Sequence, residues 1–248
     1  MIFRRIATAL QRQDWTMVLI EFLLVILGVV IALQVTNWNE ARSDQARVLR
    51  YLDELRVDIK AERVEMARIR DNALRRYAAL NYLLYQASGW QPPQTIPLFG
   101  DDFVLETIPE VDVSIGPALF NEALSMETFD GQRHTYDALT STGDFQLFEN
   151  LAIASDLRAY YADLRTFQDF ENSYLRPQHI ELINLLHRHG LSHPGIFEVD
   201  LVVNALKDDK ELASHFRAYS LLAFNHYRRL PPLIERAERI DARLGARQ

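Results

Sequence analysis

The sequence predicts an all-α protein: one N-terminal transmembrane helix continues into a long helix, followed by an antiparallel helical bundle outside the membrane and a Pro-rich loop arm. Three observations favour this fold class. An apolar segment lies between Trp15 and Trp38 and is uninterrupted from Phe22 to Leu33. Apolar residues then recur at helical spacing, with no proline or glycine before Gly89. The 248 residues contain nine glycines and nine prolines, and no strand-like alternation persists.

Residues 1–14 precede the apolar run. Within them, Ile6 and Leu10 alternate with Arg5 and Arg12 at helical spacing. This amphipathic pattern is typical of a short helix that lies in the membrane interface. We therefore expect an interfacial segment at 1–14, with a disordered tail as the alternative.

Residues 15–38 have the length and composition of a membrane-spanning helix. At about 1.5 Å per residue they extend roughly 36 Å, whereas a bilayer core is about 30 Å thick. Trp15 and Trp38 lie where interfacial aromatic anchors belong, and Gln34 and Asn37 are polar residues at the outer boundary. The apolar run is longer than that of a cleaved signal peptide, so we expect an uncleaved signal anchor.

Arginines flank this span on both sides, so the positive-inside rule alone does not orient it. The arginines after the span are interleaved with acids such as Glu40 and Asp44, and they open a large domain of the kind that translocates largely regardless of charge. We expect a protein of the bacterial inner membrane, with a cytoplasmic N-terminus and a periplasmic C-terminal domain. The absence of cysteine fits an oxidising compartment and equally fits the cytoplasm.

One face of the span combines a carboxylate with small residues. The Glu21 position lies about 9 Å along the helix from Trp15, deep enough for its carboxylate to need a partner. Gly28 and Ala32 form a small-xxx-small pair, which lets a second helix backbone approach closely. In the alternative, the Glu21 side chain reaches back to the headgroups. We assign the whole stripe to contact with another membrane helix: Glu21, Val25, Gly28, Ala32, Val35 and Asn39.

Residues 39–88 are expected to form a long amphipathic helix. Its apolar positions recur at steps of three and four, with one gap at Glu62 and Arg63, and its opposite face is rich in charged residues. A continuous rod of about 70 residues reaches roughly 100 Å, and its stripe must be covered by later helices or by another subunit. The stripe comprises Leu52, Leu55, Ile59, Met66, Ile69, Ala73, Tyr77, Leu80 and Leu84.

Residues 89–117 are the predicted loop arm and 118–248 the predicted helical domain that packs on the long helix. The apolar content of the arm indicates that it packs on something rather than being a free linker. Pro177 is expected to end or kink one helix of the domain, and Pro231–Pro232 to interrupt the last one. The helical patterns cover 118–126, 135–139, 148–176, 199–206 and 211–244.

The sequence offers no residues that we assign to a catalytic, cofactor-binding or metal site. The net charge of −7, without a dense basic face, argues against a nucleic-acid partner. The nucleotide-binding and hydrolase motifs are absent. The best metal candidates are His187, His189 and His193, but histidines two apart on a helix point to different faces, and no nearby set of ligands completes a shell.

Carboxylates and aromatic residues concentrate between 160 and 181. Asp169, Glu171 and Glu181 are isolated acids in amphipathic helices, so we expect them on the solvated face. The aromatic residues are expected to form bundle core, with a ligand pocket as the alternative. They are Tyr160, Tyr161, Phe167, Phe170 and Tyr174.

The string EFLLVILGVVIALQVTNWNE, at 21–40, resembles the start of an uncharacterised family of bacterial single-span membrane proteins. The family has a Glu-led apolar segment ending in Ile-Ala-Leu-Gln-x-x-Asn-Trp-Asn-Glu, followed by a long charged helix. A second similarity covers 136–144 and the tyrosine pair at 160–161. Because the family has no assigned activity, the resemblance implies topology rather than function. The matching residues are Glu21, Gly28, Ile31, Ala32, Leu33, Gln34, Asn37, Trp38, Asn39 and Glu40.

These patterns lead to an expected function. We expect a membrane-anchored structural or accessory subunit without intrinsic catalysis, whose partners are the lipid bilayer and other transmembrane helices, or copies of itself. The alternative is a periplasmic helical-bundle sensor that binds a ligand and acts through a partner. A membrane-tethered enzyme is the least favoured class, because the sequence shows no convergent site. No cofactor and no nucleic-acid partner are expected.

Overall fold

The computed structural model describes residues 15–93, 95–98, 101–104, 110–131, 133–149 and 151–246. The chain divides into two compact units, 1–52 and 53–248, and each is described by itself. The interfacial segment predicted at 1–14 lies outside the described residues.

The first unit contains the beginning of helix α2, which extends from Trp15 to Ser88. Its large apolar side chains from Leu19 to Val35 are all exposed, by 42–62%. The helix is long and apolar enough to cross a membrane, and among the described residues it alone meets that test. Monomeric soluble proteins rarely expose so long an apolar surface, and a helix of this length and composition could span a membrane.

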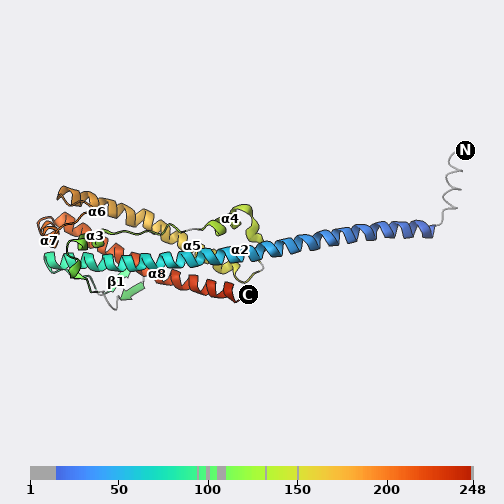
Figure 1. Ribbon diagram of the computed structural model, residues 1–248, viewed down its shortest axis with the longest axis horizontal. Coiled ribbons are helices and arrows are strands. Elements are labelled where there is room, and N and C mark those ends of the chain that lie inside the picture. Colours follow the sequence, from blue (N-terminus) through green and yellow to red (C-terminus); the bar gives the residue numbers. More distant parts are fainter. Residues whose placement is uncertain are drawn as a thin grey trace. The chain divides into compact units, whose positions relative to one another are not determined.

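The second unit is built on three helical rods (Figure 1). One is the part of α2 after residue 52. Another is formed by α5 (Ala154–Phe170), the π-helix η3 (Glu171–Leu175) and α6 (Arg176–Arg188), which follow one another without a break. The last is α8 (Lys210–Gly245). The predicted all-α class is therefore confirmed.

Side-chain contacts give the direction of these rods. Between α2 and α8, Arg56 pairs with Asp241 and Asn81 with Ser220, so the two helices are antiparallel. Arg236 of α8 pairs with Asp163 of α5, while Arg243, further along α8, pairs with Asp156. Since α8 is antiparallel to both other rods, α2 and α5–α6 are parallel to each other.

Because α2 and α5–α6 are parallel, the chain must return along the bundle between the end of α2 and the start of α5. The segment before α5 makes this return. It contains β1 (Thr95–Leu98) and β2 (Asp101–Val104), an antiparallel pair, then the 3₁₀-helix η1 (Val113–Ile115). It continues through α3 (Ala118–Leu124), an irregular stretch, α4 (His134–Thr142) and the 3₁₀-helix η2 (Asp144–Phe148). The irregular stretch runs along the bundle between α3 and α4 (Figure 1).

The predicted stripe on the long helix is confirmed as core. Each member from Leu55 onward is at most 2% exposed. The short helices predicted around 118–126, 135–139 and 199–206 are present as α3, α4 and α7 (Val199–Asp208). The left-handed backbone at Gly143 (φ 80°) ends α4, as the Ser-Thr-Gly-Asp turn requires.

The β-hairpin was not predicted. Its strands have four residues each, and Pro97 lies inside the first, where sequence patterns argue against a strand. A two-stranded ribbon has only edge strands, so a proline without a backbone N–H is tolerated on its outer side.

Pro177 does not end the helix. The chain instead passes through a π-turn, in which the Arg176 N–H donates to the Glu171 carbonyl, and α6 continues with Pro177 in its first turn. A proline removes one helical hydrogen bond and crowds the carbonyl four residues earlier, so the wider π-turn supplies the room that it needs.

The predicted interruption at Pro231–Pro232 is wrong, because α8 continues through both residues to Gly245. Leu230 and Leu233, on either side of the pair, are buried in the bundle. Packing of the flanking turns therefore outweighs the loss of two backbone donors.

Candidate functional site

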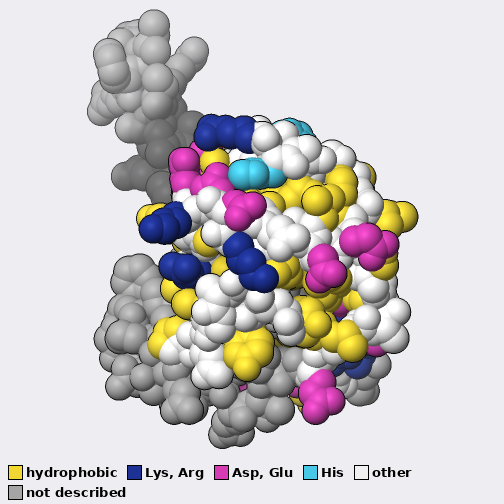
Figure 2. Space-filling model, turned by 90° about the vertical axis from the view of Figure 1, so that its left-hand side faces the viewer, with side chains coloured by type: hydrophobic (Ala, Val, Ile, Leu, Met, Phe, Trp, Pro, Cys, Tyr) yellow, Lys and Arg dark blue, Asp and Glu magenta, His cyan; other side chains and the backbone are white. Residues whose placement is uncertain are grey.

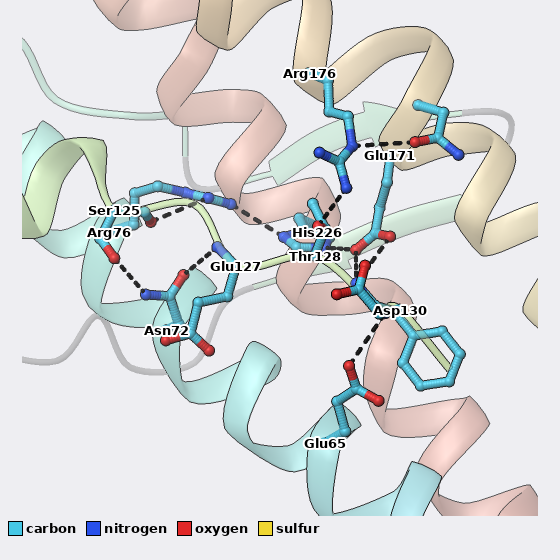
Figure 3. A network of polar contacts seen from close by, with 12 residues as sticks. Glu65, Asn72, Arg76, Ser125, Glu127, Thr128, Asp130, Glu171, Arg176 and His226 are labelled. Carbon is cyan, nitrogen blue, oxygen red and sulfur yellow. Dashed lines mark hydrogen bonds and ion pairs between the residues drawn. The ribbon is translucent and has the colours of Figure 1, made fainter. Parts of the chain in front are cut away.

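A buried chain of polar side chains crosses the centre of the second unit (Figure 3). Arg76 of α2 donates from Nη2 to His226 Nδ1 of α8 at 3.0 Å, and His226 Nε2 lies 2.8 Å from Glu171 Oε1 of η3. The three side chains are at most 2% exposed. They join three elements that are far apart in sequence.

The positions of the protons follow from the donors. A guanidinium only donates, so His226 Nδ1 accepts and Nε2 carries the hydrogen that is donated to Glu171. Burial and the nearby Arg76 charge lower the pKa of His226 well below its ordinary value, so this ring is neutral. Burial raises the pKa of Glu171 to about 8, although the Phe129 N–H, Arg176 and Arg76 act in the opposite direction.

The same side chains hold the irregular stretch at 125–130, which has no regular secondary structure to satisfy its backbone. Phe129 N donates to both Glu171 oxygens at 3.1 Å, and Arg76 Nη1 donates to the Ser125 carbonyl at 3.3 Å. We name this set of loop-holding side chains the loop clamp. It comprises Glu65, Asn72, Arg76, Glu171, Arg176 and His226.

The remaining clamp contacts are shown in Figure 3. Asn72 accepts from Glu127 N at 3.4 Å, and Glu65 accepts from Asp130 N at 3.1 Å. Arg176 donates to Thr128 Oγ1 at 2.6 Å. Buried backbone groups need partners, so the clamp lets an irregular segment lie against the bundle. Among the described residues, the Glu171–His226 pair is enclosed and contributes to holding this segment.

A second buried polar group lies on α2, 14 positions before Arg76. Glu62 is 1% exposed and accepts from Tyr160 Oη at 2.7 Å. Its other oxygen, and the hydroxyl of the neighbouring Tyr161, have no hydrogen-bond partner among the described residues. Burial raises the pKa of Glu62 to about 7, with Asp58 and Glu65 contributing in the same direction.

A groove of about 630 Å³ opens between α5–η3 and α8. Phe170 and Tyr174 line one side, with ring centroids 6.2 Å apart, and the Arg229 guanidinium lies 4.5 Å from the Phe170 centroid. Arg229 Nε donates to Asn225 Oδ1 at 3.1 Å. The full lining is Thr166, Asp169, Phe170, Ser173, Tyr174, Leu222, Asn225 and Arg229.

The π-turn of η3 contributes residues to both the loop clamp and the groove. Glu171, its first residue, joins the buried clamp, whereas Ser173 and Tyr174 line the groove. π-turns of this kind are frequent at functional sites. Four of the five predicted core aromatics are buried, but Tyr174 is 63% exposed. Phe170 and Tyr174 both line the groove, and for these two residues the ligand-pocket alternative stays a prediction.

Figure 2 shows the face of the bundle on the side where α6 and α7 lie. On the described part of this face, hydrophobic side chains lie among acidic and basic ones. Ile196 and Leu201 are 78% and 52% exposed. Scattered apolar residues of this kind are normal on a solvated surface, so the groove is the more informative feature.

The residues predicted to contact another membrane helix all lie on α2 in the first unit. Val25 and Val35 are exposed by 62% and 59%, and a Cβ added at Gly28 would meet nothing within 4 Å. The contact itself stays a prediction. Of the predicted anchors, Trp38 is 65% exposed with the Arg42 guanidinium 5.8 Å from its ring, while the Trp15 side chain lies outside the described residues. Gln34 and Asn37 are exposed.

The three histidines that were considered for a metal do not meet. His189 Nε2 lies 2.8 Å from Asp209 Oδ2, next to the start of α8. The His193 ring lies 6.1 Å from that of His179, and His187 is exposed. Within the ranges that the structure describes, no group of three or more potential ligands could hold a metal ion.

Sequence patterns missed the buried charges. Glu171 was expected on the solvated face and is instead 2% exposed, because Phe129, His226 and the π-turn enclose it. Arg76 was not singled out by the sequence pattern and is fully buried. One signal was present: the gap at Glu62 falls where the apolar stripe requires a core residue between Ile59 and Met66.

Comparison with known proteins gives one match. Residues 21–89 match a family of unknown function (DUF6090). No curated protein and no solved structure matched the chain. The matching region contains α2 from Glu21 to its end at Ser88 and stops before the hairpin, so the chain is similar to an uncharacterised family in the part that carries most of the possible span.

Proposed function

We propose that this chain is a membrane-anchored structural or accessory subunit, without catalysis of its own, that assembles with other transmembrane helices or with copies of itself. The observation that carries the proposal is the apolar helix of the first unit, in which every large side chain between Leu19 and Val35 is exposed and Glu21 lies near one end. Lipid satisfies the apolar side chains but not a carboxylate, so a protein partner is favoured.

The small residues support helix contact rather than simple anchoring. With no Cβ at Gly28 and only a methyl group at Ala32, a second backbone can approach closely on the face that carries Glu21. A Cβ added at Gly28 would have no neighbour within 4 Å among the described residues. Substitution there consequently tests contact with another chain without disturbing this one.

Replacing Gly28 by leucine is expected to weaken assembly about tenfold, because the larger side chain holds the two backbones apart and removes the close packing between them. Glu21→Leu should weaken it to a similar extent. The measurement is the complex-to-monomer ratio of the full chain in a dilution series, in mild detergent or lipid nanodiscs. Leucine favours a helix more than glycine does, so helix loss does not explain a weaker complex.

The matched control is Val30→Phe, which adds similar bulk on the opposite face of the same helix. It should leave assembly unchanged. If Gly28→Leu and Glu21→Leu assemble as well as the wild type, the proposed contact face is rejected. If Val30→Phe weakens assembly as much as Gly28→Leu does, the added bulk rather than its position on the helix accounts for the effect.

We further propose that the span lies in a bacterial inner membrane, with the N-terminus in the cytoplasm and the second unit in the periplasm. The support is the domain length and the mixed charge after the span. Because the chain has no cysteine, Ser43→Cys introduces a single reactive thiol. An impermeant maleimide should label it in intact spheroplasts; labelling only after lysis would reverse the orientation.

A periplasmic sensor that acts through a partner is the second candidate, and the groove beside Arg229 favours it. In this role, ligand in the groove changes which chains associate with the span. Co-purification with and without ligand tests it: identical companions in both samples, with the groove occupied, would count against the sensor.

A further inference from the structure

The groove contains an arginine that is oriented for an anion. Asn225 and Phe170, which contact the Arg229 side chain, are each 5% exposed, so core packing fixes both. No acidic side chain within the described ranges pairs with Arg229. Asn225 holds the planar guanidinium through Nε, and the Phe170 ring lies against one of its faces. Its two terminal amino groups match the two oxygens of a carboxylate.

Positive charge is concentrated at this end of the groove. Arg228 Nε also donates to Asn225 Oδ1, at 3.2 Å, so two guanidinium groups share one neutral amide. Burial and Arg228 both lower the pKa of Arg229, which indicates that its charge is incompletely compensated. A bound anion would supply that compensation.

The rest of the lining suits an apolar body. Phe170 and Tyr174 present stacked rings inclined by 22°, and Leu222 lies on the α8 side. Tyr174 keeps 63% of its surface exposed although it belongs to this lining. A volume of about 630 Å³ lies within the range of about 300–1,000 Å³ found for small-molecule sites.

The acidic residue of the lining sets the charge of the ligand. Asp169 is exposed and shares the groove with Arg229, so a doubly charged phosphate would meet about twice the repulsion from Asp169 that a single carboxylate meets. We propose that the groove binds a small, water-soluble monocarboxylic acid with an apolar, ring-containing body, the carboxylate on Arg229 and the body on Phe170 and Tyr174. This inference deepens the sensor candidate and is independent of assembly through the span.

The test is isothermal titration calorimetry of the full chain in non-ionic detergent with 4-phenylbutyrate, using protein-free micelles as the blank. We expect saturable binding to the wild type, and at least tenfold weaker binding to Arg229→Ala, since a charge-assisted contact is lost. Neutral 4-phenylbutanamide should bind at least tenfold less well than the acid. Arg217→Ala, an exposed arginine on the same helix, is the matched control and should bind as the wild type does.

Further variants keep the proposal open to refutation if Arg229→Ala misfolds. Tyr174→Ala truncates an exposed side chain and should weaken binding several-fold, whereas Asp169→Asn should strengthen it by removing repulsion. Any one of four results would overturn the proposed ligand class: the acid does not bind, the acid and the amide bind equally well, 4-phenylbutyl phosphate binds more tightly than the acid, or Asp169→Asn binds the acid more weakly than the wild type does. Binding without any change in companion chains would support this inference and count only against the sensor role.

Discussion

Replacing Arg76 by methionine is expected to destabilise the second unit by about 3–5 kcal/mol, the range for removing one partner of a buried charged network. Arg76 is fully buried and donates to His226 Nδ1 and to the Ser125 carbonyl. Methionine fills part of the space but donates nothing, so both acceptors lose a donor and Glu171 loses the nearest buried positive charge.

The adjacent arginine provides the control. The Arg75 side chain is 56% exposed and pairs with Glu122 at 3.3 Å, so Arg75→Met should cost no more than about 1 kcal/mol. The measurement is chemical unfolding of the full chain in mild detergent, followed by near-ultraviolet circular dichroism from the bundle tyrosines. Equal midpoints for the two variants would show that the clamp does not stabilise the bundle.

Replacing Glu62 by glutamine is expected to stabilise the protein by roughly 3 kcal/mol at pH 9 and to change little at pH 5. Burial raises the pKa of Glu62 from 4.5 to about 7. A carboxyl group with a raised native pKa contributes stability that is fully present below 4.5 and is lost as the pH rises through about 7. Glutamine resembles the protonated acid, keeps an oxygen for the Tyr160 hydroxyl and never ionises.

The difference in unfolding free energy between the wild type and Glu62→Gln reports on Glu62 alone, because Glu171 and the buried histidines are present in both proteins. Unfolding midpoints at pH 5, 7 and 9 should diverge progressively, with the variant the more stable at high pH. Parallel pH profiles would mean that Glu62 ionises as freely in the native protein as in the unfolded chain, contrary to its burial beside Tyr160.

Both predictions concern buried polar residues whose partners the periodicity of the sequence could not identify. Apolar spacing reveals which positions face the core, and it placed Leu55 through Leu84 correctly. It does not reveal a polar core residue whose partner is distant in sequence: Arg76 and His226 are 150 positions apart, and Glu62 and Tyr160 are 98 apart. Such pairs become visible only once α2, α5 and α8 are side by side.

The prolines were the other place where the structure differs from the prediction made from the sequence. Sequence rules treat Pro177 and Pro231 as helix breakers, because each lacks a donor and crowds the preceding turn. In the structure a π-turn precedes Pro177, and flanking packing carries α8 through Pro231. The groove depends on the first of these accommodations, since the π-turn carries Ser173 and Tyr174 in its lining. Local propensity therefore predicts the helices but not this groove.

The central claim is that the exposed apolar helix joins this chain to others within the membrane. Native mass measurement of the full chain, extracted in mild detergent, tests it most directly. The account predicts a particle heavier than one chain of 28.8 kDa, containing further copies or other membrane proteins, and a shift toward the single chain in Gly28→Leu. A wild-type particle of 28.8 kDa at every concentration, free of other chains, would contradict it.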